Sequence, residues 1–198
     1  MANWCSTNID IKCKKQDSAE KIYESFKKWL KSTKEGITDG WIGNLLLNSG
    51  MMNSVEEIEK DYETRGTVTD LSVCSDTVLL YTETAWVPML KAIRDVLDHF
   101  FYDDVTDFWY TATEPGCEVY CSNDPDVAEK YVLETDDSLY PDEWFEEADA
   151  IKTLTECLKT KGIETSSKTI EELQKEYDYL GIDLSVHQYD YIEEYELD

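Results

Sequence analysis

Hydrophobic and polar residues near the start of the chain follow two different periods. Residues 9–13 alternate apolar and polar side chains, a period of two that predicts a half-buried strand. Asp17 and Ser18 then fit the N-cap of a helix, because their side-chain oxygens can accept from free backbone N–H groups. Apolar residues recur every fourth position across residues 22–30, which predicts a helix with one face against a sheet.

The central stretch, residues 65–121, predicts most of the fold. Alternating segments there indicate strands, and a 3/4/4 apolar spacing after Pro88 indicates a helix, since proline suits a first helical turn. A turn at residues 114–116 closes a hairpin. The predicted elements are strands 67–74 and 77–82, helix 88–101, and strands 105–113 and 117–121.

Two residues that precede the predicted helix at 88–101 are expected to have structural roles at its start. We expect Trp86 to fill the seam between sheet and helix, and Glu83 to cap the first backbone N–H groups, where the helix dipole favours a carboxylate. The alternative is that both residues contact a ligand.

The order of elements through residue 113 is that of a split βαβ unit. It predicts an α+β, ferredoxin-like chain with an antiparallel sheet and helices on one face, covering residues 1–135 with a helical insertion at about 37–66. Residues 136–198 are expected to be an acidic helical extension packed on the same core. The further elements are a strand at 130–134, helices at 141–162 and 169–181, and a strand within 184–197; Thr169 with Glu172 fits a capping box at the start of the second helix.

The charge of the chain is unusual in size and in placement. The net charge is -26, whereas a small soluble domain carries a magnitude of roughly 2 to 8. Residues 1–66 hold 10 basic and 11 acidic residues, and residues 67–198 hold 8 basic and 33 acidic residues. Two explanations stay open: a solvated acidic face, or a surface that imitates the phosphate backbone of a nucleic acid. Direct nucleic-acid binding is disfavoured because it needs a basic patch.

The sequence offers little chemistry for catalysis or metal binding. It has six cysteines without a Cys-x-x-Cys pair, and two histidines, so neither a zinc site nor another metal site is expected. It lacks a glycine-rich phosphate loop, a His-Glu-x-x-His motif and a Gly-x-Ser-x-Gly motif. We therefore expect no enzyme and no cofactor. The chain shows no signal peptide and no membrane-spanning apolar run, which favours a cytoplasmic protein with free thiols.

Short signatures add a family resemblance. Asn3-Trp4-Cys5-Ser6, the segment 82–88 (Thr-Glu-Thr-Ala-Trp-Val-Pro), and Tyr110 with the turn 114–116 together resemble the YubB-like ferredoxin-like proteins of phages and plasmids. The resemblance covers roughly residues 1–135. It differs at Thr7, because the family usually reads Asn-Trp-Cys-Ser-Asn there. The resemblance implies a ferredoxin-like fold and a mobile-element origin, and it supplies no catalytic residue and no iron–sulfur cluster.

The acidic C-terminal part is the stronger functional lead, because aromatic residues stand among its carboxylates and aromatic anchors carry much of the energy of protein interfaces. The opposite interpretation is that each aromatic residue is core and each acid faces solvent. The candidate partner-binding residues are Asp136, Asp137, Glu143, Trp144, Glu146, Glu147, Asp149, Glu171, Glu172, Glu176, Tyr191, Glu193 and Glu194.

These observations favour a non-enzymatic phage or mobile-element protein that binds and inhibits a basic nucleic-acid-binding host protein. A CRISPR effector is the concrete case, inhibited by nucleic-acid mimicry with electrostatic steering. The alternative is a structural or regulatory accessory protein whose acidity serves solubility alone. An enzyme is the third interpretation, because abundant carboxylate pairs single out no catalytic pair.

Overall fold

The computed structural model describes residues 3–32, 36–62, 64–135 and 144–193, and the chain divides into two compact units. The first unit comprises residues 1–124 and 192–198, and the second comprises residues 125–191. The second unit is therefore inserted in sequence before the C-terminal residues of the first. Both units contain helices and strands, which confirms the expectation of an α+β chain.

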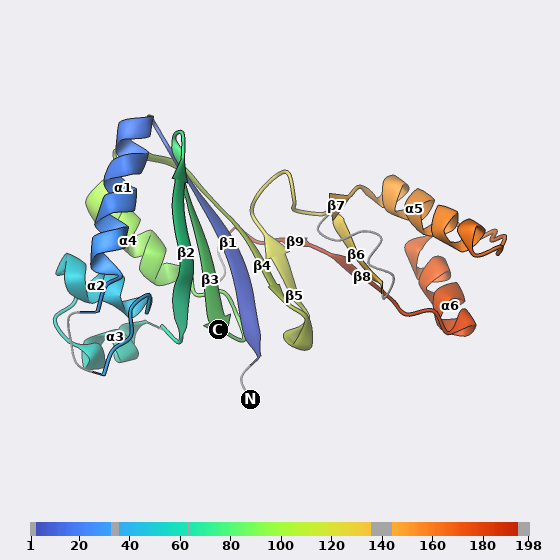
Figure 1. Ribbon diagram of the computed structural model, residues 1–198, viewed down its shortest axis with the longest axis horizontal. Helices are drawn as coiled ribbons and strands as arrows, with labels where there is room; N and C mark the ends of the chain where they lie inside the picture. Colours follow the sequence, from blue (N-terminus) through green and yellow to red (C-terminus); the bar gives the residue numbers. More distant parts are fainter. Residues whose placement is uncertain (1–2, 33–35, 63, 136–143, 194–198) are drawn as a thin grey trace. The chain divides into compact units, whose positions relative to one another are not determined.

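The first unit contains an antiparallel sheet with four helices and one short 3-10 helix among its described residues. Its strands follow the order β2-β3-β1-β4-β5, and each of the four neighbouring pairs is antiparallel. Figure 1 shows α1 and α4 on the same face of this sheet. The elements are β1 (Trp4–Cys13), α1 (Gln16–Trp29), α2 (Gly43–Ser49), α3 (Val55–Asp61), β2 (Gly66–Cys74), β3 (Thr77–Ala85), α4 (Lys91–Phe101), β4 (Val105–Glu114), η1 (Pro115–Cys117) and β5 (Val119–Ser122).

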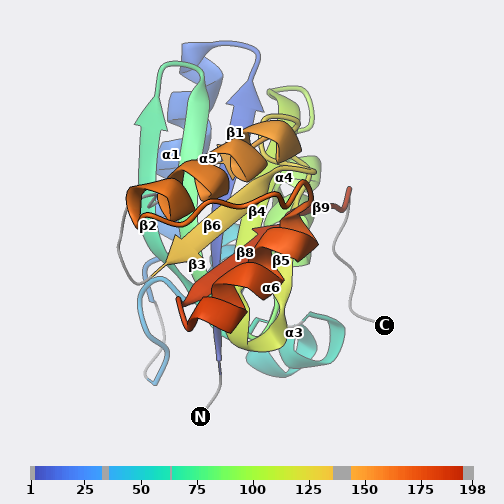
Figure 2. The ribbon, with the colours of Figure 1, turned by 90° about the vertical axis from the view of Figure 1, so that its right-hand side faces the viewer.

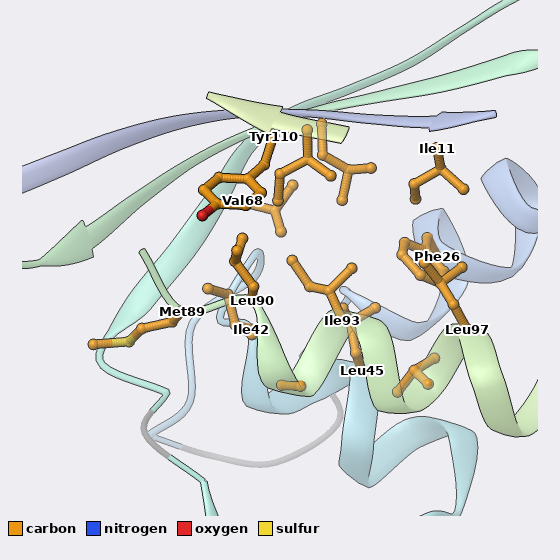
Figure 3. Close-up of a cluster of buried hydrophobic side chains, with 14 of the residues drawn as sticks. Ile11, Phe26, Ile42, Leu45, Val68, Met89, Leu90, Ile93, Leu97 and Tyr110 are labelled. Atoms are coloured by element: carbon orange, nitrogen blue, oxygen red, sulfur yellow. The ribbon is translucent and has the colours of Figure 1, made fainter. Parts of the chain in front are cut away.

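Buried and more exposed side chains alternate along β1, and the buried ones show which face of the sheet packs against the core. Ile9 lies opposite Leu80 of β3 and Tyr110 of β4, and all three side chains are buried. Figure 3 shows sheet residues, Tyr110 among them, pointing toward Phe26 of α1 and Ile93 of α4. A one-residue slip of β1 would turn this whole set to the other face, so the core fixes the register.

The start of α1 differs from the prediction. The helix begins at Gln16, and its N-cap is Lys15, which makes no side-chain cap. Ser18 is instead buried, and its Oγ donates to Asp104 Oδ1 at 2.7 Å, while Asp17 is exposed in the first turn. The predicted cap at Asp17 and Ser18 is wrong because Ser18 finds a partner far along the chain.

The start of α4 also differs from the prediction. The helix begins at Lys91 instead of Pro88, and Glu83, the predicted cap, lies eight positions earlier within strand β3. Residues 88–90 are all buried. Packing of these residues against the core therefore sets the helix start, and the proline only precedes it.

The second unit has its own small sheet and its own core. The sheet order is β7-β6-β8, and both strand pairs are antiparallel. Helices α5 and α6 pack side by side (Figure 2). The elements are β6 (Tyr131–Thr135), β7 (Trp144–Phe145), α5 (Glu147–Thr160), α6 (Ile170–Leu180), β8 (Leu184–Gln188) and β9 (Asp190–Tyr191). The buried cluster consists of Leu133, Ala150, Leu154, Cys157, Leu158, Ile170, Leu173, Tyr177 and Leu184.

The structure divides the chain differently from the prediction. The predicted boundary falls after residue 135, but β6 pairs with β8 inside the second unit, so the boundary falls after Asp124. The prediction that residues 136–198 pack on the core of residues 1–135 also differs, because the second unit encloses a separate buried cluster. The apolar periodicity of a helix shows that one of its faces is buried. It does not show which part of the protein packs against that face.

The last described residues return to the first unit. Ile192 N–H donates to Ser122 O at 3.1 Å, and Tyr110 Oη donates to Ile192 O at 2.8 Å. Arg94 Nη2 donates to Glu193 O at 2.9 Å. The predicted terminal strand within 184–197 therefore becomes β8 and β9, followed by this short attachment.

Candidate partner-binding surface

The first group of predicted binding residues lies at the start of α5. Glu146 is the N-cap, and Glu147 and Asp149 stand in the first turn. All three are exposed, and the Glu146 side chain is 71% exposed although its Oε1 lies 3.8 Å from Lys130 Nζ. Carboxylates are favoured at this end of a helix because the macrodipole is positive there. The same acids are therefore available for a partner and useful to the helix.

The second group lies at the start of α6, where the predicted capping box is confirmed. Thr169 is the N-cap, and its Oγ1 accepts from Glu172 N–H at 3.2 Å. Glu172 Oε2 in return accepts from Lys168 N–H at 2.8 Å. Glu172 thus serves the helix terminus, whereas Glu171 beside it is exposed in the first turn.

Thr169→Ala is expected to lower the free energy of unfolding of the second unit by about 1 kcal/mol, because one backbone N–H of α6 loses its acceptor. Denaturant unfolding followed by amide exchange in α6 measures this loss. Thr155→Ala in α5 is the matched control, since its hydroxyl only donates back to Ile151 O within the helix. Equal effects of the two substitutions would contradict the capping role.

Glu176 has a structural partner set of its own. Its carboxylate is half-buried and accepts from Thr165 Oγ1, and from Ser167 Oγ at 2.9 Å, both in the connection between α5 and α6. These bonds hold the connection against the helix. Glu172 and Glu176 therefore have structural partners, and we do not count them as partner-binding residues.

Tyr131 of β6 packs against the buried cluster to which α5 and α6 both contribute. Burial raises the pKa of Tyr131, and the negative charges of Glu147 in α5 and Glu171 in α6 raise it further. Trp144 lies on β7 opposite Val132, the neighbour of Tyr131, so its 45% exposed side chain lies on the other face of the small sheet from Tyr131. We define the α5–α6 acidic surface as the set Tyr131, Glu146, Glu147, Asp149 and Glu171.

The remaining predicted binding residues are placed elsewhere or are not described. Tyr191 is 54% exposed in β9, and Glu193 is exposed after it, with its backbone carbonyl bound to Arg94 in the first unit. Glu193 belongs to the first unit, whereas the acids at the starts of α5 and α6 belong to the second. The predicted residues that lie outside the described ones are Asp136, Asp137, Glu143 and Glu194.

A second constellation joins the sequence signatures at one end of the first sheet. Trp4 lies opposite Ala85, and Trp86 N–H donates to Asn3 O at 3.0 Å. At the third signature, a Cβ on Gly116 would collide with the Asn3 amide. Three segments far apart in sequence therefore lie together. The sequence shows the three signatures, and their shared family resemblance was the only sequence signal that linked them. That signal did not indicate that they form an exposed surface.

Trp86 does not fill the seam between sheet and helix as predicted. Its side chain is 41% exposed, its φ is 69°, and the Arg65 guanidinium carbon lies 4.7 Å from the ring centroid. The left-handed backbone turns the side chain outward, a conformation that is rare for a bulky residue. Sequence periodicity cannot reveal such a backbone, so its burial was predicted wrongly.

The thiols give no sign of nucleophilic chemistry in the core. Burial raises the pKa of Cys5 to about 11, against the contact with the Thr7 hydroxyl, and burial raises the pKa of Cys13 to about 11 as well, with the carboxylates of Asp104 and Asp76 adding to it. A raised pKa leaves the reactive thiolate scarce near neutral pH. Within the described ranges, no group of three or more His, Cys, Asp or Glu side chains is arranged to hold a metal ion.

The comparisons leave the family open. No family model, no curated protein and no solved structure matches the chain. None of the helices in the described part of the chain has the length and apolar character needed to cross a membrane.

Proposed function

We propose that this chain is a non-enzymatic protein of a phage or other mobile element that binds and inhibits a basic nucleic-acid-binding host defence protein. The observation that carries the proposal is the α5–α6 acidic surface, where the first turns of two helices that share one buried cluster carry exposed acids, in a chain of net charge -26. The partner class includes CRISPR effectors, whose guide and target channels are positively charged. A cytoplasmic location accompanies the proposal because such partners act there.

The architecture of the first unit supports the mobile-element part of the proposal. Its element order of strand, helix, two inserted helices, strand, strand, helix, strand fits a ferredoxin-like fold with an insertion. The order β2-β3-β1-β4 with antiparallel neighbours fits it too. We therefore propose a ferredoxin-like first unit, as the resemblance to YubB-like proteins implies.

The electrostatics support an interface role for the second unit. Residues 125–191 carry 18 acidic and 6 basic residues, so the unit is strongly acidic by itself. Such a surface attracts a basic groove over about a Debye length, roughly 8 Å at physiological salt, and raises the association rate. The exposed Trp144 adds an aromatic anchor of the kind found at binding hot spots.

The alternative is an accessory protein whose acids serve only solubility and helix stability. One observation favours it: Glu147, Asp149 and Glu171 stand in first helical turns, where a carboxylate is stabilising without any partner. The two functions differ in one measurable property. Only the inhibitor needs these particular acids for binding.

The triple variant Glu146→Lys, Glu147→Lys and Asp149→Lys is expected to bind a purified CRISPR effector about tenfold or more weakly than the wild type. Reversing the acids removes attraction and adds repulsion toward a basic groove, each close pair being worth about 1 kcal/mol or more. Binding is measured by biolayer interferometry at low and at high salt, and with duplex DNA as competitor. We expect both salt and DNA to release the wild type.

The control is a variant with the same change in net charge on the first unit, Asp98→Lys, Asp103→Lys and Asp107→Lys, at three exposed acids. It should bind nearly as the wild type does. Thermal unfolding of both variants establishes that the second unit is folded. Equal loss of affinity in both variants would show that only the net charge of the protein matters. Unchanged affinity in both would show that the α5–α6 acidic surface does not take part in binding.

A further inference from the structure

Two large aromatic side chains lie exposed at the end of the first sheet where the sequence signatures meet. Trp4 is 55% exposed and Trp86 is 41% exposed. Trp4 is the first residue of β1, and Trp86 directly follows the last residue of the neighbouring strand β3, Ala85, which lies opposite Trp4. Tryptophan is among the residues most enriched at binding hot spots. Two exposed tryptophans at the same end of the sheet therefore indicate a binding surface.

The backbone at Trp86 strengthens this point. Its φ of 69° lies in the left-handed region, which is costly for a residue with a bulky side chain. Hydrogen bonds on both sides maintain the conformation: Trp86 N–H donates to Asn3 O at 3.0 Å, and Ala85 N–H donates to Arg65 O at 2.9 Å. The strain does not bury the indole ring, since the ring stays substantially exposed. Core packing therefore does not account for a tryptophan at this position.

The contact with Arg65 shows which chemistry the ring accepts. The guanidinium carbon of Arg65 lies 4.7 Å from the centroid of the Trp86 ring, a distance typical of cation–π stacking. Guanidinium groups stack on indole better than ammonium groups do, because they are planar and weakly hydrated. Exposed Glu83, two positions before Ala85 on β3, adds negative charge at the same end of the sheet.

We propose that Trp4 and Trp86 form a binding surface for arginine side chains of a basic polypeptide partner, which approach the indole faces as Arg65 does. The net charge of -26 supplies the charge complementarity with such a partner. This surface lies on the first unit and shares no residue with the α5–α6 acidic surface. It rests on the proposed function only for the expectation that the partner is basic.

The test uses the full chain and its six tryptophan indole N–H signals in a nitrogen-15 correlation spectrum. Oligo-arginine and oligo-lysine peptides of equal length are the probes. The expected result is that oligo-arginine shifts the signals of Trp4 and Trp86 at about a tenfold lower concentration than oligo-lysine does. Trp29 and Trp41, which pack against the core, should not shift. Trp144, two residues before Glu146, reports on the second unit separately.

Each outcome supports or overturns the arginine surface. A shift confined to Trp144 overturns the arginine surface and leaves the acidic surface standing. Equal response of Trp4 and Trp86 to both peptides overturns the arginine surface as well, since the attraction is then only electrostatic. An oligo-arginine preference at Trp4 and Trp86 supports the arginine surface, whether or not Trp144 shifts.

Two variants keep the test independent of folding. Trp86→Gly removes the ring and suits the positive φ, so it should keep or raise the melting temperature while the arginine preference at Trp4 falls about tenfold. Trp4→Ala should have the same effect on the Trp86 signal. Tyr102→Ala is the matched control, because Tyr102 is 76% exposed on the same unit. Retention of the arginine preference in Trp86→Gly and Trp4→Ala overturns the proposal.

Discussion

Leu154→Ala is expected to lower the free energy of unfolding of the second unit by about 2–5 kcal/mol and to leave the first unit unchanged. Leu154 is 1% exposed in the buried cluster between α5, α6 and the small sheet, and its carbonyl accepts from Tyr177 Oη at 2.8 Å. The substitution removes apolar contacts and leaves a cavity that the surrounding side chains fill only in part. The effect stays local because the two buried clusters are separate.

Native-state amide hydrogen exchange measures this prediction, since it reports the opening free energy of each element. In Leu154→Ala, the amides of α6 and β6 should exchange faster, and those of β1 and β3 should keep the wild-type rate. The reciprocal control is Ile93→Ala, at a fully buried residue of the first cluster, which should affect β1 and β3 and spare α6. Equal losses in both units from either substitution would show one cooperative core.

Local pattern was enough to predict most strands and helices, because their burial follows period two or period 3.6. β1 is expected from residues 9–13 and found at Trp4–Cys13, and α6 is expected from its capping box and found at Ile170–Leu180. The capping box succeeds because all of its partners lie within four residues. The predicted cap at Ser18 fails because its hydroxyl binds Asp104, 86 residues away.

The division into two units could not be read from the sequence. β6 has the same alternating pattern whichever sheet it joins, and only its pairing with β8 assigns it to the second unit. The apolar faces of α5 and α6 were also predictable, but the sequence does not say that they cover each other and a separate small sheet. Both questions depend on long-range packing, which leaves no local period.

The sequence predicted which types of residue form the candidate site, but not which particular residues belong to it. Composition indicated acids mixed with aromatic residues, and in the structure the charges of Glu147 and Glu171 both raise the pKa of Tyr131. Glu172 and Glu176 have the same residue type and similar spacing, yet one completes a helix cap and the other holds a connection. The exposure of Trp86 depends on a single backbone angle, which no residue pattern around it indicates.

The first unit is expected to lose on the order of 2–3 kcal/mol of unfolding free energy through Cys5 as the pH rises from about 9 to about 11. Burial raises the pKa of the Cys5 thiol from 9.0 to about 11 in the folded state. Because the folded pKa lies above the unfolded value, the protonated thiol favours folding. Its contribution is complete below about pH 9 and is lost toward about pH 11, at about 1.4 kcal/mol per pKa unit.

Denaturant unfolding of the wild type and of Cys5→Ala across this pH range, with a reducing agent present, isolates the contribution. Cys5→Ala costs some stability at every pH, but its curve should fall less steeply, so the two curves converge above about pH 9. Cys13, whose pKa burial also raises to about 11, is present in both proteins and cancels in the comparison. Cys74→Ala is the control for removing a thiol, because Cys74 is exposed. Parallel curves for Cys5→Ala and the wild type would mean that water reaches this thiol in the folded protein.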